Sequence, residues 1–337
     1  MRWIRIWNVR APLAAAAALC ALAARAQSFP ADKEWVPLRC GADVMTDPYR
    51  DRASALGERD LVGDLNAATG FRASDGEWLF LRIRVEQDPI PGGTPRPFAW
   101  GLLLDRDGDL STYEVQILAS GLDGTVQISQ NTVTAQPNDP ADPPDQPILR
   151  TYPMAKNARS LVAPGSSYGG NADYFLDFAV PWQDLGAVKL SPATPVTAWV
   201  ATSSTSNVLD GDFACFDDAA GRPTLSGADP GKTTLDPRVD SDGDGYTDQV
   251  ELRNGTDPHS ASSHPGGAPD ALIYAGGGGC SAAPGSPAMV GLALMLVAWA
   301  LRGAATSAAR SPGRSGAGDP AGRGRRGSAR GCRAGRG

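Results

Sequence analysis

Alternating apolar and polar residues mark six short β-strands between residues 78 and 201. Turns rich in Asp, Gly and Pro separate these segments, and little helical periodicity is present. The pattern predicts a mostly β fold, an antiparallel β-sandwich of the jelly-roll or immunoglobulin-like kind. The predicted strands are Trp78–Val85, Phe98–Leu104, Thr112–Leu118, Thr125–Ser129, Tyr174–Val180 and Val196–Ala201.

A hydrophobic run near the start of the chain predicts export. Three arginines within the first ten residues precede an alanine- and leucine-rich run at 11–24, and small residues lead up to Ala26. These are the three parts of a secretory signal peptide. We therefore expect residues 1–26 to be removed by cleavage after Ala26.

Twelve residues, Asp240–Glu251, have the spacing of a calcium-binding loop. Carboxylates occupy positions one, three, five, nine and twelve, and Gly245 at position six permits a sharp turn. Calcium takes six to eight oxygen ligands, and a loop of this spacing can supply them. The alternative is an acidic, solvated turn, in which five like charges repel one another. The expected ligands are the side chains of Asp240, Asp242, Asp244 and Glu251, the carbonyl of Tyr246, and Asp248 either directly or through a water molecule.

The segment after this loop narrows the type of calcium site. Leu252–Pro258 is too short and too rich in helix breakers to form a full exiting helix, and Gly255–Pro258 reads Gly-Thr-Asp-Pro. Residues 240–258 therefore resemble a thrombospondin type-3 calcium repeat. The next acidic loop usual in such arrays is missing. The resemblance implies a single structural calcium in a rigid spacer.

A second hydrophobic run predicts attachment to the cell surface. Four glycines lead to Cys280, and an apolar stretch at 287–301 is followed by arginines. This order resembles the MYXO-CTERM class of bacterial C-terminal sorting signals, although the chain continues further than such signals usually do. The resemblance implies cleavage near Cys280 and attachment to the membrane through the C-terminal helix or a lipid on the cysteine. An ordinary single-pass anchor remains the alternative.

These features divide the chain into seven parts. They are a signal peptide (1–26), the β-sandwich domain (27–220), a linker (221–239), the calcium-binding repeat (240–258), a linker rich in Gly, Pro and Ser (259–279), a sorting or transmembrane segment (280–304) and a disordered basic tail (305–337).

Charge and cysteine content restrict the partners and the compartment. Of 31 basic and 37 acidic residues, 13 arginines and one aspartate fall in residues 1–26 and 302–337, which leaves 18 basic and 36 acidic residues. This acidity disfavours nucleic acid and anionic membrane surfaces as partners. Cys40 and Cys215 lie near the two ends of the sandwich and are expected to pair outside the cytosol, stabilising the fold by about 4 kcal/mol or more. Two buried free thiols are the alternative.

The order of the strands carries a second resemblance. Residues 75–85, 100–117 and 174–186 are similar to the bacterial surface domains related to family-nine carbohydrate-binding modules and the DOMON superfamily. An Asp-rich hairpin, a Tyr-Glu strand and a Pro-Trp-x-x-Leu corner carry the likeness. It implies a sandwich fold, and sugar or haem binding is inherited or lost within such families.

Several residues in the sandwich are weaker candidates for binding. Asp105, Asp107, Asp109 and Glu114 form a second possible cation site, with an Asp-Gly hairpin turn as the alternative. Trp35 is the tryptophan most suited to contact a sugar ring. Arg82 and Arg84 share one strand face, where they either bind a ligand or are solvated.

The inventory of catalytic residues argues against an enzyme. The two histidines of the chain, His259 and His264, both follow the repeat, so a Ser-His or Cys-His pair within the sandwich is excluded. The resulting expectation is a secreted, surface-anchored, non-enzymatic protein that binds calcium and whose sandwich binds a neutral polysaccharide or another envelope component. The alternatives are a purely structural envelope protein and a glycoside-processing enzyme or its binding appendage.

Overall fold

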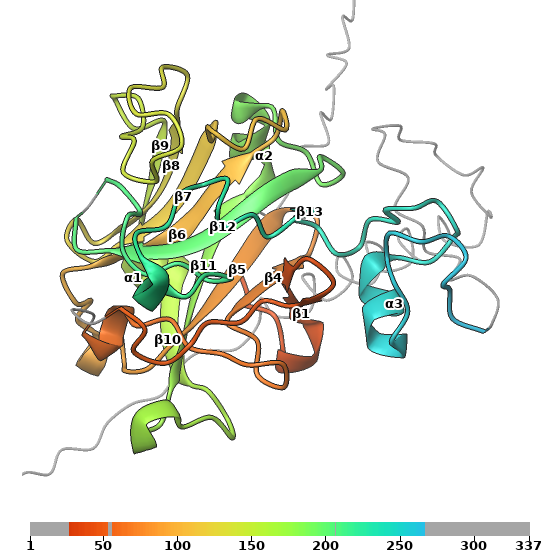
Figure 1. Cartoon of the computed structure of the whole chain (residues 1–337), viewed down its shortest axis with the longest axis horizontal. Helices are drawn as coiled ribbons and strands as arrows, with labels where there is room; N and C mark the ends of the chain where they lie inside the picture. Colours follow the sequence, from red (N-terminus) through yellow and green to blue (C-terminus); the bar gives the residue numbers. More distant parts are fainter. Residues whose placement is uncertain (1–26, 53–55, 206, 267–337) are drawn as a thin grey trace, which may run out of the picture. The chain divides into compact units, whose positions relative to one another are not determined.

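The computed structural model describes residues 27–52, 56–205 and 207–266. Within this part of the chain, two antiparallel sheets form a sandwich-like domain (Figure 1). The first sheet contains, in spatial order, β1 (Val36–Pro37), β4 (Gly70–Ser74), β5 (Trp78–Val85), β11 (Tyr174–Pro181) and β10 (Ala158–Val162). The second contains β13 (Lys232–Thr233), β12 (Val196–Ser203), β6 (Ala99–Asp105), β7 (Val115–Ser120), β8 (Thr125–Gln130) and β9 (Arg150–Pro153). A separate hairpin pairs β2 (Arg39–Cys40) with β3 (Asp43–Val44).

Helices in the described residues are short, and they lie before, between or after the strands. The α-helices are α1 (Met154–Asn157), α2 (Trp182–Leu185) and α3 (Asp248–Asn254). The 3-10 helices are η1 (Asp32–Glu34), η2 (Gly57–Arg59), η3 (Pro91–Gly93), η4 (Tyr168–Gly170), η5 (Gly186–Val188) and η6 (Asp218–Ala220).

The main core lies between the two sheets. Every second residue of β5, from Leu79 to Val85, joins one cluster of buried apolar side chains with Leu102 and Leu104 of β6. Alternate residues of a strand point to opposite faces, so the intervening residues lie on the outer face of their sheet. In both sheets the central strands are buried on this second face as well.

A buried ion pair stabilises the outer face of the first sheet. Arg82 of β5 and Asp177 of β11 are cross-strand partners, and the guanidinium binds both carboxylate oxygens at 2.6 and 3.0 Å. Arg82 also lies 4.3 Å from the ring centroids of both Trp35 and Phe175. Arg84 donates to the Ala68 carbonyl at 3.0 Å. The expectation that these arginines bind a ligand or face solvent is therefore wrong.

Residues 209–228 cover the outer face of the second sheet. Leu103 of β6 and Trp199 of β12 are cross-strand partners there, and they cluster with Leu209, Phe213, Leu225 and Ala228. The Trp199 indole donates to the Leu225 carbonyl at 3.0 Å. Residues 232–233 then form β13 beside β12 (Figure 1), and Leu235 joins the main core. Residues 221–239 therefore pack as part of the domain, in contrast to the predicted linker.

The six strands predicted from the sequence are all present. β5 has the predicted bounds, and the ends of β6, β8, β11 and β12 differ by one or two residues. β7 begins at Val115, three residues later than predicted, because residues 106–114 form the turn that precedes it. The remaining strands are short or have no clear alternation of apolar and polar residues.

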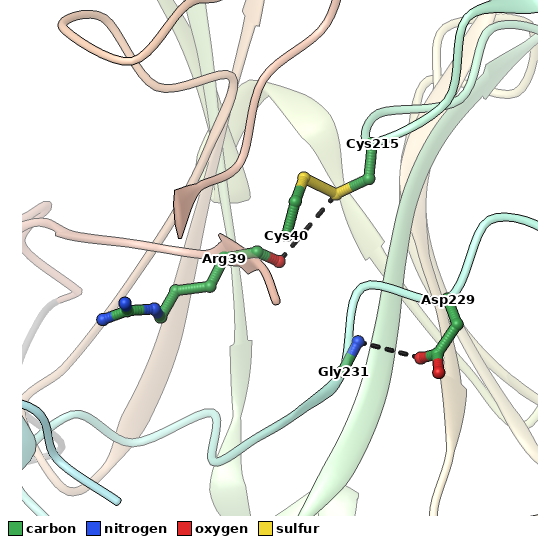
Figure 2. Close-up of a disulfide and its surroundings, with 5 residues drawn as sticks. All are labelled: Arg39, Cys40, Cys215, Asp229 and Gly231. Atoms are coloured by element: carbon green, nitrogen blue, oxygen red, sulfur yellow. Dashed lines mark hydrogen bonds between the residues drawn. A yellow bond between two sulfur atoms is a disulfide. The ribbon is translucent and has the colours of Figure 1, made fainter. Parts of the chain in front are cut away.

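A disulfide connects the first and last parts of the domain. Cys40 in β2 is bonded to Cys215, and their Cα atoms are 5.6 Å apart (Figure 2). Both cysteines pack against the main core. A backbone hydrogen bond of 2.9 Å from Gly41 to the Pro230 carbonyl joins the same two regions. The predicted pairing is confirmed.

Several predictions concern residues outside the described ranges. The signal peptide at 1–26, Cys280, the sorting segment at 280–304 and the tail at 305–337 are among them. Among the residues that the structure describes, no helix is both long and apolar enough to cross a membrane.

Loss of the disulfide should destabilise the domain. Cys40→Ala combined with Cys215→Ala is expected to lower the free energy of unfolding by about 2–5 kcal/mol, because the bond closes a loop of 175 residues. Urea denaturation with and without reductant measures the change. The account requires that reductant lower the midpoint of the wild type but not that of the variant; equal midpoints for all samples would contradict it.

Candidate metal centre

The loop at 240–246 is folded by its own aspartates. Asp240 accepts hydrogen bonds from the backbone N–H groups of Gly243 and Gly245, at 2.7 and 2.9 Å. Asp242 accepts from Asp244 at 3.2 Å, and Asp244 accepts from Tyr246 at 2.9 Å. Gly245 has a φ of 99°, a conformation that residues other than glycine rarely adopt. The predicted role of this glycine in the turn is thus confirmed.

This folding brings carboxylate oxygens together at one point. One oxygen from each of Asp240, Asp242 and Asp244 lies within 4.8 Å of the others. The second oxygens of Asp242 and Asp244 are buried and accept no hydrogen bond from the described residues. Such orphaned acceptors are costly inside a protein, and a bound cation would satisfy them.

Glu251 reaches the same place from α3. Thr247 caps this helix by accepting from the Val250 N–H, and the helix ends at Gly255, as its sequence predicts. Glu251 is fully buried, and neither of its carboxylate oxygens has a hydrogen-bond partner among the described residues. Burial, followed by repulsion from the aspartates of the loop, raises the pKa of Glu251 to about 8. Burial also raises the pKa of Asp242. The donor set consists of oxygen atoms and carries negative charge, which fits calcium.

Asp248 makes its hydrogen bonds outside the group formed by Asp240, Asp242 and Asp244. One of its oxygens accepts from the Thr234 and Ser241 hydroxyls at 2.9 and 3.0 Å and lies 3.3 Å from the Arg72 guanidinium. The other oxygen accepts from the Ser241 N–H at 3.1 Å. Arg72 lies in β4, and both charged side chains are buried. In this arrangement Asp248 anchors the repeat to the first sheet, and it stays close enough to Glu251 to help raise the pKa of that carboxyl.

Two further contacts join α3 to the domain. The Gln249 side chain donates to the Glu34 carbonyl at 3.1 Å, and Arg253 donates to the Lys33 carbonyl at 2.7 Å. Arg72 also donates to the Thr233 hydroxyl in β13. The repeat is therefore docked on the sandwich, where the sequence predicted a separate spacer.

The side chain of Tyr246 makes a contact that the structure shows, whereas its backbone carbonyl is a predicted ligand. Its ring stacks on His264, with centroids 5.9 Å apart and planes 2° from parallel. This contact ties the residues after the repeat to the loop. Ligation by the Tyr246 carbonyl stays a prediction.

The second predicted cation site is assembled only in part. Asp105, Asp107 and Glu114 bring one oxygen each within 4.8 Å. Asp105 also accepts from the backbone of Asp107 and Gly108 at 2.9 and 2.7 Å, as an Asp-Gly turn does. Asp109 is absent from this group and instead accepts from the N–H and hydroxyl of Ser111. The turn and the cation site both remain compatible with this geometry.

A third acidic cluster has no counterpart in the sequence predictions. Asp47, Asp51 and Asp212 bring one oxygen each within 4.8 Å. More than 160 residues separate the first two from the third, so no local motif marks the cluster. Only the disulfide prediction, which brings Cys40 and Cys215 together, placed these two regions near each other.

The sandwich offers no exposed tryptophan platform within the described residues. Trp35 and Trp182 are each 7 % exposed, Trp100 and Trp199 are buried, and Trp78 is half-buried. The proposed role of Trp35 in contacting a sugar therefore finds no support, because its ring packs under Arg82.

A concave pocket of about 480 Å³ lies elsewhere on the domain. Ile90 and Met154 contribute apolar surface, and Asp88, Arg159 and Ser160 contribute polar groups. The Ser160 hydroxyl donates to Asp88 at 2.6 Å. The size and the mixed lining are those of a small-molecule site.

Comparison with known families identifies the acidic loop and its helix. Residues 240–261 match the family model of the bacterial TSP3 repeat. Searches of curated proteins and of solved structures found no match. The match implies calcium binding, which the cluster of Asp240, Asp242 and Asp244 fits. Together with the disulfide, it indicates an extracellular protein.

Calcium binding at the repeat should strengthen as the pH rises. Because the pKa of Glu251 is raised from 4.5 to about 8, this carboxyl holds a proton at neutral pH and must release it to a cation. Without calcium, the stability contributed by the proton is complete below pH 4.5 and is lost as the pH rises through 8. Calcium affinity should therefore rise by up to about tenfold per pH unit below pH 8.

Titration calorimetry of the full chain at pH 6, 7 and 8 measures this slope. Glu251→Gln should bind more weakly and make the dependence of affinity on pH less steep, whereas Asp43→Asn, at an exposed position of β3 outside the repeat, should leave that dependence unchanged. Equal slopes for wild type and Glu251→Gln would show that the proton does not come from Glu251.

Proposed function

We propose that this protein is a non-enzymatic, exported surface protein in which calcium fixes the TSP3 repeat against a β-sandwich. One observation carries the proposal. Asp242 and Asp244 bring oxygens together in one cluster, and Glu251, whose two oxygens are buried and unpartnered, lies close enough to be repelled by them and by Asp248, which is itself bound to the sheet. A cation there holds the loop in the shape that presents Asp248 to Arg72.

In this proposal the repeat acts as a rigid end to the domain. Calcium neutralises the loop, the loop positions Asp248, and the buried ion pair with Arg72 connects α3 to β4. The chain that follows then leaves the sandwich from a fixed point. Such a device suits a domain held at a cell surface by a C-terminal segment, through either the predicted sorting or transmembrane segment at 280–304 or a lipid on Cys280.

The sandwich in this proposal binds a neutral polysaccharide or another component of the envelope. The pocket beside Met154 supports it, because apolar surface and a few polar groups meet there. The acidity of the exported part favours a neutral partner over an anionic one.

Loss of the repeat site should loosen the repeat and leave the sandwich folded. In Asp242→Asn combined with Asp244→Asn, calcium has too few charged ligands, so limited proteolysis should cut between residues 240 and 258 even in calcium. Asp43→Asn, at an exposed position outside the repeat, is the matched control and should resist cleavage like the wild type. Arg72→Met should also expose the repeat, although it leaves the loop carboxylates intact. Cleavage of wild type and double variant at the same rate would refute the role of calcium.

Binding to envelope material is tested by polysaccharide pull-down and glycan array with the full chain. Ala155→Trp places a large side chain at the mouth of the pocket, and Ala219→Trp adds the same bulk at an exposed position elsewhere. The proposal predicts retention of the wild type and the control and loss of at least about tenfold in the Ala155 variant. If none of the three proteins binds a polysaccharide or glycan, a purely structural role is favoured. If the protein converts a glycan into a product, an enzyme is favoured.

A further inference from the structure

Four aspartates from opposite ends of the sandwich sequence meet inside the described domain. Asp47 and Asp51 follow β3, whereas Asp212 and Asp218 follow β12. The backbone of Asp47 pairs with Gly63, and Thr202 of β12 donates to the Asp212 carbonyl at 3.0 Å. Packed backbone on both sides therefore holds the carboxylates in place.

Asp47, one of the two most buried members of the group, lies in it without a hydrogen-bond partner among the described residues. Asp47 is 1 % exposed, neither of its carboxylate oxygens has a hydrogen-bond partner among the described residues, and one of them lies within 4.8 Å of oxygens of Asp51 and Asp212. Leaving a buried carboxylate without a donor costs several kcal/mol, so this side chain indicates that something binds there.

Each of the other three aspartates has at least one carboxylate oxygen that accepts no hydrogen bond from the described residues. Asp212 accepts from the Leu61 N–H at 2.6 Å through one oxygen, and Asp51 accepts from the Asp218 N–H at 2.9 Å through one oxygen. In both, the second oxygen is buried and without a partner in the described chain. Both oxygens of Asp218 are buried and accept no hydrogen bond from the described residues.

Positive charge near the group is small. The Arg52 guanidinium lies 3.7 Å from Asp218 and donates to the backbone carbonyls of Asp210 and Gly211. Asp60, whose pKa burial raises to about 7, adds negative charge nearby. Burial, followed by repulsion from the neighbouring aspartates, raises the pKa of Asp47, and the same causes raise that of Asp218 to about 6.

We propose that Asp47, Asp51, Asp212 and Asp218 form a second calcium site within the β-sandwich. The donors are all carboxylate oxygens, the ligands that a hard cation prefers, and six oxygens of the four residues are buried and accept no hydrogen bond from the described residues. Soft or nitrogen-preferring metals lack their ligands here, because the nearby Cys40 and Cys215 are bonded to each other.

This cation crosslinks the same two segments as the disulfide. Cys40 and Asp47 belong to one segment, and Asp212, Cys215 and Asp218 belong to the other. The Cys215 N–H also donates to the Thr46 carbonyl at 2.9 Å, one residue before Asp47. Calcium at this site therefore stabilises the sandwich itself, independently of the repeat.

The test uses the full chain in a background that removes the repeat site, Asp242→Asn with Asp244→Asn. Calorimetry in calcium should still show one equivalent bound per chain, and calcium should raise the melting temperature by several degrees. Adding Asp47→Asn should abolish both effects. In chelator the same substitution should leave the melting temperature equal or higher, because it removes a repulsive charge. Asp43→Asn, at an exposed position of β3, is the matched control and should change neither effect.

Three results would overturn the proposal. The first is that the background protein binds no calcium, and that its melting temperature falls with rising pH by the same amount with and without calcium. This result would indicate that the carboxyl groups share protons instead of binding a cation. A second is binding that survives Asp47→Asn but is lost in Asp107→Asn, which would place the cation at the turn between β6 and β7. If Asp47→Asn does not fold in calcium or in chelator, Asp218→Asn at the edge of the cluster replaces it. The third contradicting result is that this Asp218 variant still binds calcium.

Discussion

A carboxylate removed from water must meet a positive charge or hydrogen-bond donors, and this requirement organises the described structure. Asp177 meets it with two arginines, since Arg82 binds both of its oxygens and Arg159 adds a contact at 2.8 Å. Asp248 meets it with Arg72 and two hydroxyls. Several carboxylates that do not meet it are gathered in groups, where a cation could satisfy their converging oxygens.

The same requirement explains why the repeat belongs to the domain. Asp248 lies within the calcium loop in sequence but binds the sheet in space, so the shape of the loop and the attachment of α3 depend on each other. Breaking a buried ion pair by removing one partner costs about 3–5 kcal/mol, which is a large share of the stability of a domain. In the proposed function, calcium binding at the loop is therefore coupled to the attachment of α3 to β4.

Local patterns predicted what depends on local sequence. Alternation along Trp78–Val85 located β5, and the spacing of Asp240, Asp242, Asp244 and Glu251 located the acidic loop. The segment that covers the outer face of the second sheet was harder to predict, because residues 209–228 lack periodicity and their apolar side chains are scattered among glycines and aspartates. Asp248 fits a ligand position by spacing, and only the three-dimensional placement of Arg72 and Thr234 shows its other role. The cluster around Asp47 depends on tertiary contacts between distant segments, so no spacing rule reveals it.

Anomalous diffraction from crystals of the protein grown in millimolar calcium tests the central claim most directly, since it locates the metal without reference to stability or affinity. The account predicts a strong calcium peak bounded by Asp240, Asp242, Asp244 and Glu251, with Asp248 still bound to Arg72. A loop with the same fold and only water among those carboxylates would contradict it.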